Sequence, residues 1–153
     1  RSSDLYKKII ALEPDSKNFK KLVRNTENFS NIETHNAVAW NCDTCIPFDS
    51  RNGRQSSVKK SGVLSQARSV DSILDGSEAG IIKMDIEGAE YQAIKGAENT
   101  IRRHSPKLMI SLYHRNEDMF KLPLLIHSIN PDYKFFIRHQ LYIPAWETNL
   151  YCI

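Results

Sequence analysis

The chain has 153 residues, enough for a hydrophobic core, and we predict a single domain over residues 1–153. Charged residues make up 25% and hydrophobic residues 41%, as in an ordinary globular protein. The net charge of +3, without a dense run of lysine and arginine, argues against nucleic acid as a partner. No apolar stretch approaches the ~20 residues that span a bilayer, so we expect no membrane partner either.

Three cysteines, Cys42, Cys45 and Cys152, are too few for a disulfide framework, and a reducing cytoplasm is the expected compartment. Cys42 and Cys45 form a CxxC motif, which supplies fewer ligands than a structural zinc ion requires. Pro47 follows the motif, where a redox-active pair would need the start of a helix. We therefore predict neither a metal site nor a redox site at this pair.

Residues 5–12 predict a strand, because they end in the short β-branched run IIAL. The turn that follows contains Glu13, and Asp15 or Ser16 is expected to cap a helix. In nucleotide-binding α/β folds, an acid at the end of a strand commonly accepts hydrogen bonds from ribose hydroxyls. Glu13 is therefore a candidate ligand-binding residue, although a glutamate before a proline is also common in plain turns.

The next strand is predicted over residues 32–40, with Asn36 and Ala37 inside it or at a bend. The stretch CDTCIPFDS, residues 42–50, is expected to form a short hairpin arm. Residues 50–65 are polar and contain an Asn-Gly pair, which predicts an exposed loop. A loop of that length in a compact domain is usually functional or disordered.

Residues 70–74 predict a short helix, and GIIKMDIEGAE at residues 80–90 predicts a buried strand, a turn and another helix. The apolar run Ile81–Ile86 is short and flanked by glycines, as expected for an interior strand of a parallel sheet. Strand side chains alternate between faces, so Lys83 and Asp85 point to the same side. We expect these two charges to pair or to face a cleft.

Glu87 and Glu90 follow Asp85 at the start of a helix predicted over residues 89–103. Ligands of open α/β sheets lie at this edge, beyond the carboxyl ends of the strands. The carboxylates could instead be placed there simply because the helix dipole favours them. Asp85 and Glu87 could also hold a divalent cation, but two carboxylates are too few to predict one.

Residues 107–114 predict a strand that brings His114 to the same edge if it runs parallel. A helix capped by Asn116 follows, and strands at residues 133–139 and 146–152 form a terminal antiparallel hairpin. The alternation of strands and helices predicts an α/β fold. We expect a doubly wound, mostly parallel sheet with a C-terminal antiparallel hairpin.

A nucleotide-binding α/β domain normally opens with a strand, a glycine-rich turn and a helix. Here the first glycine is Gly53, and the strand before Glu13 ends in an acid. We therefore expect the glycine-rich turn upstream of Arg1, so that the chain is the C-terminal part of a longer domain. The missing N-terminal strand would leave a gap beside residues 9–12 and 81–86. Residues outside the chain, or a second copy in a homo-oligomer, would fill it.

Seven blocks occur in order along nearly the whole chain: IIALEPDSKNFKKL, NAVA, SVDSIL, IIKMDIEGAEYQAIKGAENTI, PKLMISLYHRNEDM, FFIRHQ and ETNLYCI. Together they resemble the FkbM-type methyltransferase family, S-adenosylmethionine-dependent enzymes with a Rossmann-like sheet that often O-methylate sugars. The resemblance implies that Glu13 binds the cofactor ribose and that Asn36 and Ala37 line the adenine. It also implies that Asp85 and Glu87 lie by the methyl donor and acceptor. The glycine-rich first motif of the family has no counterpart in the chain.

Methyl transfer to a hydroxyl is an in-line displacement on an activated donor, so positioning supplies much of the catalysis. His114 is the candidate base for the hydroxyl proton, because histidine titrates near neutrality. Asp85 or Glu87 could serve instead, or could stabilise the cationic donor. We predict an S-adenosylmethionine-dependent O-methyltransferase acting on a hydroxyl of a carbohydrate or similar small molecule. The alternative is a non-catalytic Rossmann-like module or an inactive fragment.

Overall fold

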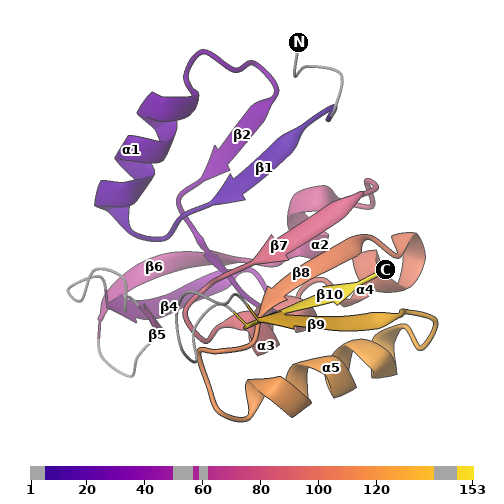
Figure 1. Ribbon diagram of the computed structural model, residues 1–153. Coiled ribbons are helices and arrows are strands. Elements are labelled where there is room, and N and C mark those ends of the chain that lie inside the picture. Colours follow the sequence, from indigo (N-terminus) through magenta and orange to yellow (C-terminus); the bar gives the residue numbers. More distant parts are fainter. Residues whose placement is uncertain (1–5, 50–56, 59–61, 140–147) are drawn as a thin grey trace. The chain divides into compact units, whose positions relative to one another are not determined.

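The computed structural model of the chain describes residues 6–49, 57–58, 62–139 and 148–153. These residues form a mixed α/β fold with open sheets (Figure 1). None of the helices among them is long and apolar enough to cross a membrane.

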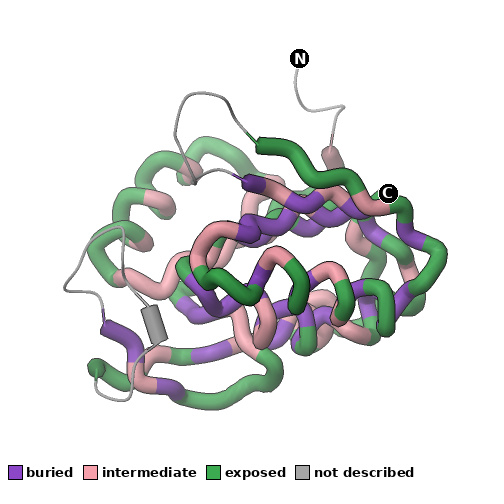
Figure 2. The backbone as a smooth tube through the Cα atoms, turned by 60° about the horizontal axis from the view of Figure 1, so that its bottom comes forward, coloured by how far each residue is buried: buried purple, intermediate pink, exposed green. Residues whose placement is uncertain are grey.

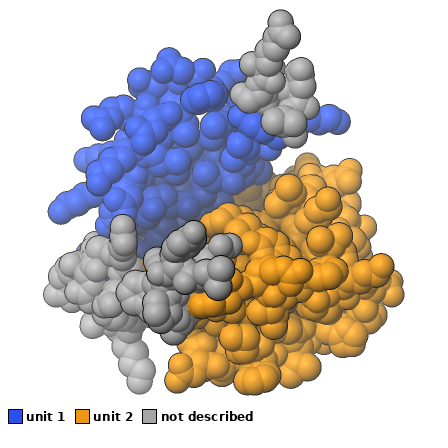
Figure 3. All heavy atoms as spheres, viewed as in Figure 1, with its two compact units in different colours: residues 1–38, 44–67 blue, residues 39–43, 68–153 orange. Residues whose placement is uncertain are grey.

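The chain divides into two compact units, which are coloured separately in Figure 3. Unit 1 comprises residues 1–38 and 44–67, and unit 2 comprises residues 39–43 and 68–153. The single domain expected over residues 1–153 stays a prediction, since two compact units can belong to one domain.

Unit 1 opens with β1 (Ile9–Leu12) and α1 (Ser16–Thr26). Asp15 is the N-cap of α1, and its carboxylate accepts hydrogen bonds from two backbone N–H groups of the first turn. These N–H groups have no partner within a helix, which is why a short acidic side chain is favoured at this position. The predicted strand, turn and capped helix are confirmed.

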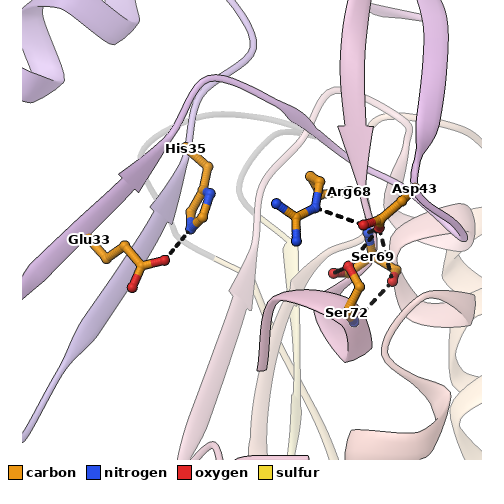
Figure 4. A network of polar contacts seen from close by, with 6 residues as sticks. All are labelled: Glu33, His35, Asp43, Arg68, Ser69 and Ser72. Atoms are coloured by element: carbon orange, nitrogen blue, oxygen red, sulfur yellow. Dashed lines mark hydrogen bonds and ion pairs between the residues drawn. The ribbon is translucent and has the colours of Figure 1, made fainter. Parts of the chain in front are cut away.

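β2 (Ile32–His35) pairs in parallel with β1, and the chain then bends before β3 (Val38–Ala39). The strand predicted over residues 32–40 is therefore two shorter strands. At the end of β2, Nε2 of His35 lies 2.6 Å from Oε1 of Glu33 (Figure 4). The hydrogen bonds with Lys8 and His35 hold the pKa of Glu33 below its usual value.

A second sheet has the order β3-β6-β4-β5. In it, β4 (Thr44–Asp49) pairs antiparallel with β5 (Ser57–Val58) and with β6 (Val63–Arg68). The predicted hairpin arm is thus confirmed as an antiparallel strand pair. The loop predicted over residues 50–65 is wrong at β5 and at its end, where β6 begins, and residues 50–56 and 59–61 lie outside the described residues. The first side chains of β6 are exposed. Its sequence, VLSQAR, therefore does not show the regular alternation of apolar and polar residues that marks a half-buried strand.

The sheet of unit 2 has the order β7-β8-β10-β9. β7 (Ile81–Met84) runs parallel to β8 (Lys107–Ser111). β10 (Thr148–Cys152) lies between β8 and β9 (Phe135–His139) and is antiparallel to both. The predicted terminal antiparallel hairpin is confirmed.

β7 forms one edge of this sheet, and Ile81 is 71% exposed. The prediction that Ile81–Ile86 is an interior strand is therefore wrong for the described residues, whereas the expected incomplete sheet beside this run stays a prediction. The β1–β2 and β7–β8 pairs are parallel, whereas β4 and β10 each pair antiparallel with both of their neighbours. The expectation of a doubly wound, mostly parallel sheet is not confirmed by these sheets.

Helices α3 (Glu90–Lys95), α4 (Glu98–His104) and α5 (Asp118–Ile129) bury their apolar side chains against one face of this sheet. Burial alternates along β7 and β10, as expected when one face of a sheet meets a core (Figure 2). The core of unit 2 includes Ile82, Met84, Ala93, Ile94, Ile101, Leu108, Ile110, Leu122, Ile126, Leu150 and Cys152.

The helix predicted over residues 89–103 is broken between α3 and α4 at Gly96. A Cβ atom at Gly96 would lie 1.9 Å from the carbonyl oxygen of Trp40, so the two backbone segments can approach only at a glycine. The N–H group of Asp71 also donates to the Gly96 carbonyl at 2.8 Å. The Asp71 carboxylate in turn accepts hydrogen bonds from the first-turn N–H groups of α4, which has no side-chain cap of its own.

Helix α2 (Val70–Leu74) confirms the predicted short helix, and the Asp43 carboxylate anchors its start (Figure 4). This carboxylate accepts hydrogen bonds from the Ser69 N–H at 2.9 Å, the Ser72 hydroxyl at 2.6 Å and Arg68 Nε at 2.8 Å. Burial alone would raise the pKa of Asp43, but the bonds from Ser72 and Ser69 and the Arg68 charge hold it below its usual value.

Helix α5 begins after Glu117 rather than after the predicted cap Asn116. Glu117 makes no side-chain cap bond, and the N–H of Asp118 donates instead to the carbonyl of Arg115 at 3.0 Å. Pro123 lies inside the helix, beyond its first turn. The backbone turn before α5 thus replaces the predicted Asn116 cap.

Candidate functional site

Asp85, Glu87 and His114 lie together in unit 2. Asp85 directly follows β7, Glu87 lies in the next turn, and His114 follows β8. His114 Nε2 is 3.5 Å from Asp85 Oδ1 and 3.6 Å from Glu87 Oε2. Because β7 and β8 are parallel, their carboxyl ends meet at one edge of the sheet. The structure brings the three residues together as predicted, while their catalytic roles stay predictions.

Glu90 is a fourth member of this cluster and is fully buried. Its Oε1 accepts a hydrogen bond from the Ile86 N–H at 2.9 Å and lies 2.7 Å from His114 Nδ1. The sequence placed Glu90 in this segment but indicated no partner for it, because burial of an acid in the first turn of a helix cannot be read from the pattern. Glu90 therefore closes the turn after β7 and holds the His114 ring.

The turn between β7 and α3 has a left-handed backbone at two successive residues, with φ of 54° at Glu87 and 90° at Gly88. Glycine adopts this conformation freely, whereas a glutamate does so at a cost. Such strain persists where the surroundings fix the backbone, and it clusters at functional sites. A Cβ at Gly88 would lie 2.9 Å from Arg115 Nε, so the Arg115 side chain lies directly against this glycine.

Two hydroxyl groups hold the Asp85 carboxylate. The Ser111 hydroxyl donates to Oδ1 at 2.9 Å and the Tyr113 hydroxyl donates to the same atom at 2.8 Å. Lys83, the expected partner, lies 3.9 Å from Oδ2, and both side chains are substantially exposed. An exposed pair at that distance contributes little. Sequence reasoning missed Ser111 and Tyr113, although strand alternation along KLMISLYH places both on one face.

The charges of the cluster shift three pKa values. Burial alone would lower the pKa of His114, but the hydrogen bond to Glu90 and the charges of Glu90, Glu87 and Asp85 raise it above its ordinary value. Burial raises the pKa of Glu87, with help from Asp85 and Glu90 and against the effect of His114. Burial and the hydrogen bond to Asp85 raise the pKa of Tyr113 to about 12, so its hydroxyl stays a donor.

The residues expected to bind a cofactor in unit 1 meet where β1 and β2 end. Asn36 Nδ2 donates to the carbonyls of Glu13 at 2.8 Å and Pro14 at 3.2 Å. Glu13 Oε1 accepts a hydrogen bond from the Asp15 N–H at 2.8 Å, and no hydrogen bond joins its second carboxylate oxygen to a described residue. Ala37 is 1% exposed and has little surface to offer a ligand.

No group of three or more histidine, cysteine, aspartate or glutamate side chains within the described residues could hold a metal ion. All three cysteines are free thiols, with Cys42 and Cys45 exposed and Cys152 buried. Burial raises the pKa of Cys152 to about 12, so this thiol has little thiolate character.

The family model for the methyltransferase FkbM domain matches residues 1–143. The chain belongs to the FkbM methyltransferase family. Its fold is similar to the crystal structure of methyltransferase FkbM from Methylobacillus flagellatus KT, with a TM-score of 0.79 and 34% sequence identity. That similarity covers 96% of this chain and 36% of the other, so the chain spans about a third of that FkbM protein. No curated protein matches the chain.

Membership of the FkbM family confirms the resemblance drawn from the KMDIEGAE block and its companions. The motif residues Asp85, Glu87 and Glu90 are also the residues that surround His114. The most specific block of the FkbM resemblance therefore coincides with the cluster of carboxylates around His114.

Proposed function

We propose that the chain belongs to an S-adenosylmethionine-dependent methyltransferase that O-methylates a hydroxyl of a carbohydrate or similar small molecule. The observation that carries this proposal is the convergence of His114, Asp85 and Glu87 at the edge where β7 and β8 end. We also propose that the complete architecture is a Rossmann-like doubly wound sheet, in which the N-terminal strand lies outside the described residues.

Each unit, taken by itself, offers groups that suit this cofactor. In unit 1, Glu13 keeps one carboxylate oxygen for ribose hydroxyls, next to Asn36. In unit 2, Asp85 and Glu87 have side chains about 40% exposed, and their negative charge suits a cationic sulfonium. When bound, S-adenosylmethionine supplies a methyl group whose carbon–sulfur bond breaks with its electron pair left on sulfur.

His114 is the proposed general base. Its Nε2 is not hydrogen-bonded to any described residue and lies on the side of the half-exposed Asp85 and Glu87. An acceptor hydroxyl within hydrogen-bond reach of Nε2 gives its proton to the ring as its oxygen attacks the methyl carbon. The Asp85 carboxylate, held by Ser111 and Tyr113, lies beside the developing imidazolium.

The test is a methyl-transfer assay with S-adenosylmethionine and a panel of carbohydrate and small-molecule hydroxyls. We expect His114→Ala to lower turnover about 10²–10⁴-fold, the usual contribution of a positioned base. Cofactor affinity should stay nearly unchanged, because the ring acts on the acceptor. His104→Ala is the matched control, since His104 ends α4 without a side-chain hydrogen bond to a described residue. Equal turnover in the two variants would remove His114 from the mechanism. A protein that neither binds the cofactor nor transfers methyl groups would favour a non-catalytic module.

A further inference from the structure

The contact between Glu90 and His114 has features that a simple surface ion pair lacks. The Glu90 side chain is 0% exposed and the His114 side chain 7%, so solvent does not compete for their hydrogen bond. Glu90 Oε1 is shared between the Ile86 N–H and His114 Nδ1, whereas Glu90 Oε2 is buried without a partner among the described residues. The buried Glu90 carboxylate therefore contacts the His114 ring at Nδ1.

A carboxylate at one ring nitrogen of histidine decides which nitrogen of the neutral ring keeps the proton. Here the acceptor faces Nδ1, so the neutral ring should carry its proton there and keep a lone pair on Nε2. Nε2 is also the atom that faces Asp85 and Glu87. The Ser-His-Asp hydrolases use the same arrangement, in which a buried acid binds Nδ1 of a histidine and Nε2 acts as the base.

We propose that Glu90 is the positioning residue of His114, fixing the ring so that Nε2 receives the proton of the acceptor hydroxyl. This inference rests on the proposed function. Glu90 touches neither the reacting atoms nor the cofactor in this scheme and acts only through the ring. The proton leaves the hydroxyl oxygen for Nε2, the oxygen bonds to the methyl carbon, and the imidazolium later releases the proton to solvent.

Charged groups from several elements surround this pair. Asp85 and Glu87 face Nε2 from the turn after β7, and Lys83 lies beyond Asp85. The Tyr113 ring lies beside the His114 ring at a tilt of 52°, with centroids 4.3 Å apart.

At the start of α5, Asp118 is 2% exposed, and its Oδ2 has no partner among the described residues. Burial and the charge of Glu90 raise the pKa of Asp118, while Arg115 opposes the shift.

The test is a pH titration of the ¹⁵N-labelled protein by NMR, which reports the protonation and the tautomer of each histidine. The His114 signals are those missing from His114→Gln. In the parent protein, the neutral ring should carry its proton on Nδ1. In Glu90→Gln, which keeps the shape but removes the charge, the ratio of neutral to protonated ring at a fixed pH should rise about tenfold or more. Glu98→Gln, which removes a half-exposed carboxylate paired with Arg102, should change nothing.

A neutral ring with its proton on Nε2 would overturn the proposal, and this result needs only the parent protein. Equal titrations in Glu90→Gln and Glu98→Gln would also overturn it. The pH profile of methyl transfer adds a second readout, because Glu90→Gln should shift its rising limb to lower pH. The expected tautomer without any methyl transfer would refute the proposed function and leave the positioning intact. Transfer with an unshifted profile in Glu90→Gln would refute the positioning alone.

Discussion

His114 links the stability of the protein to pH. The folded state raises the pKa of His114 above its ordinary 6.5, so the folded protein binds the proton more tightly than the unfolded chain. The resulting stabilisation is fully present below about 6.5 and is lost as the pH rises through the pKa of the folded state. Burial raises the carboxyl pKa values of Glu87 and Asp118 above their ordinary 4.5 and 3.8, so their contribution is likewise lost as the pH rises.

We therefore expect the free energy of unfolding to fall as the pH is raised from about 6.5 into the mildly alkaline range. Denaturant unfolding at a series of pH values measures this slope. His114→Gln should remove it and His104→Gln should keep it. A parent protein with a flat profile across this range would contradict the raised pKa. Turnover by a neutral base should rise over the same interval, so activity and stability should change in opposite directions.

Glu13 gives a residue-scale test of the cofactor site in unit 1. One of its carboxylate oxygens is free of the Asp15 N–H and can accept ribose hydroxyls. A hydrogen bond to a charged group is worth roughly 1.5–3 kcal/mol, so Glu13→Gln should weaken S-adenosylmethionine binding about tenfold or more. Calorimetric titration measures the affinity. Glu27→Gln, at the end of α1, is the control. Unchanged affinity in a folded Glu13→Gln variant would refute the ribose assignment.

At the scale of elements, the junction between α3 and α4 depends on Gly96. A methyl group there would overlap the Trp40 carbonyl oxygen at 1.9 Å, and backbone on both sides must move to relieve it. We expect Gly96→Ala to cost at least about 2 kcal/mol of unfolding free energy. Gly80→Ala is the matched control, because nothing lies within 4 Å of a Cβ there, and its effect should stay within about 0.5 kcal/mol. Thermal or denaturant unfolding of both variants decides, and equal losses would show that the close approach is unimportant.

The elements that the sequence predicted well are those with local signals. The start of α1 follows from Asp15, because a capping carboxylate acts on N–H groups only a few residues away. The break at Gly96 escaped prediction, because it depends on the carbonyl of Trp40, a residue distant in sequence. The start of β6 escaped prediction for a different reason. Its first side chains are exposed, and its apolar and polar residues do not alternate as in a half-buried strand.

Some residues of the candidate site could likewise be predicted from local sequence patterns, and others could not. The convergence of Asp85 and His114 follows from two parallel strands that end at one edge, which a strand pattern can indicate. Glu90, Ser111 and Tyr113 act through burial and hydrogen bonds, and these depend on packing between elements. Charge alone pointed to Lys83 as the partner of Asp85, but the two neutral hydroxyls lie closer to that carboxylate.

At the scale of the whole molecule, the Glu13 and His114 variants change residues of different units. Glu13 belongs to unit 1 and His114 to unit 2. Glu13→Gln should therefore change binding of the cofactor and leave the titration of His114 as it is. His114→Ala should change turnover and leave binding as it is. Together the two variants separate cofactor binding from proton transfer in a chain that spans about a third of its FkbM relative.

The edge position of β7 also bears on aggregation. Among the described residues, this strand of the unit 2 sheet pairs on one side only. An unpaired row of backbone N–H and C=O groups is a template for strands of other molecules. The largely exposed Ile81 adds apolar surface to that row. Lys83 lies two residues further along the same strand with its side chain 58% exposed. Copies stacked in register would bring these ammonium groups together, so the repulsion between them opposes amyloid-like growth from this edge.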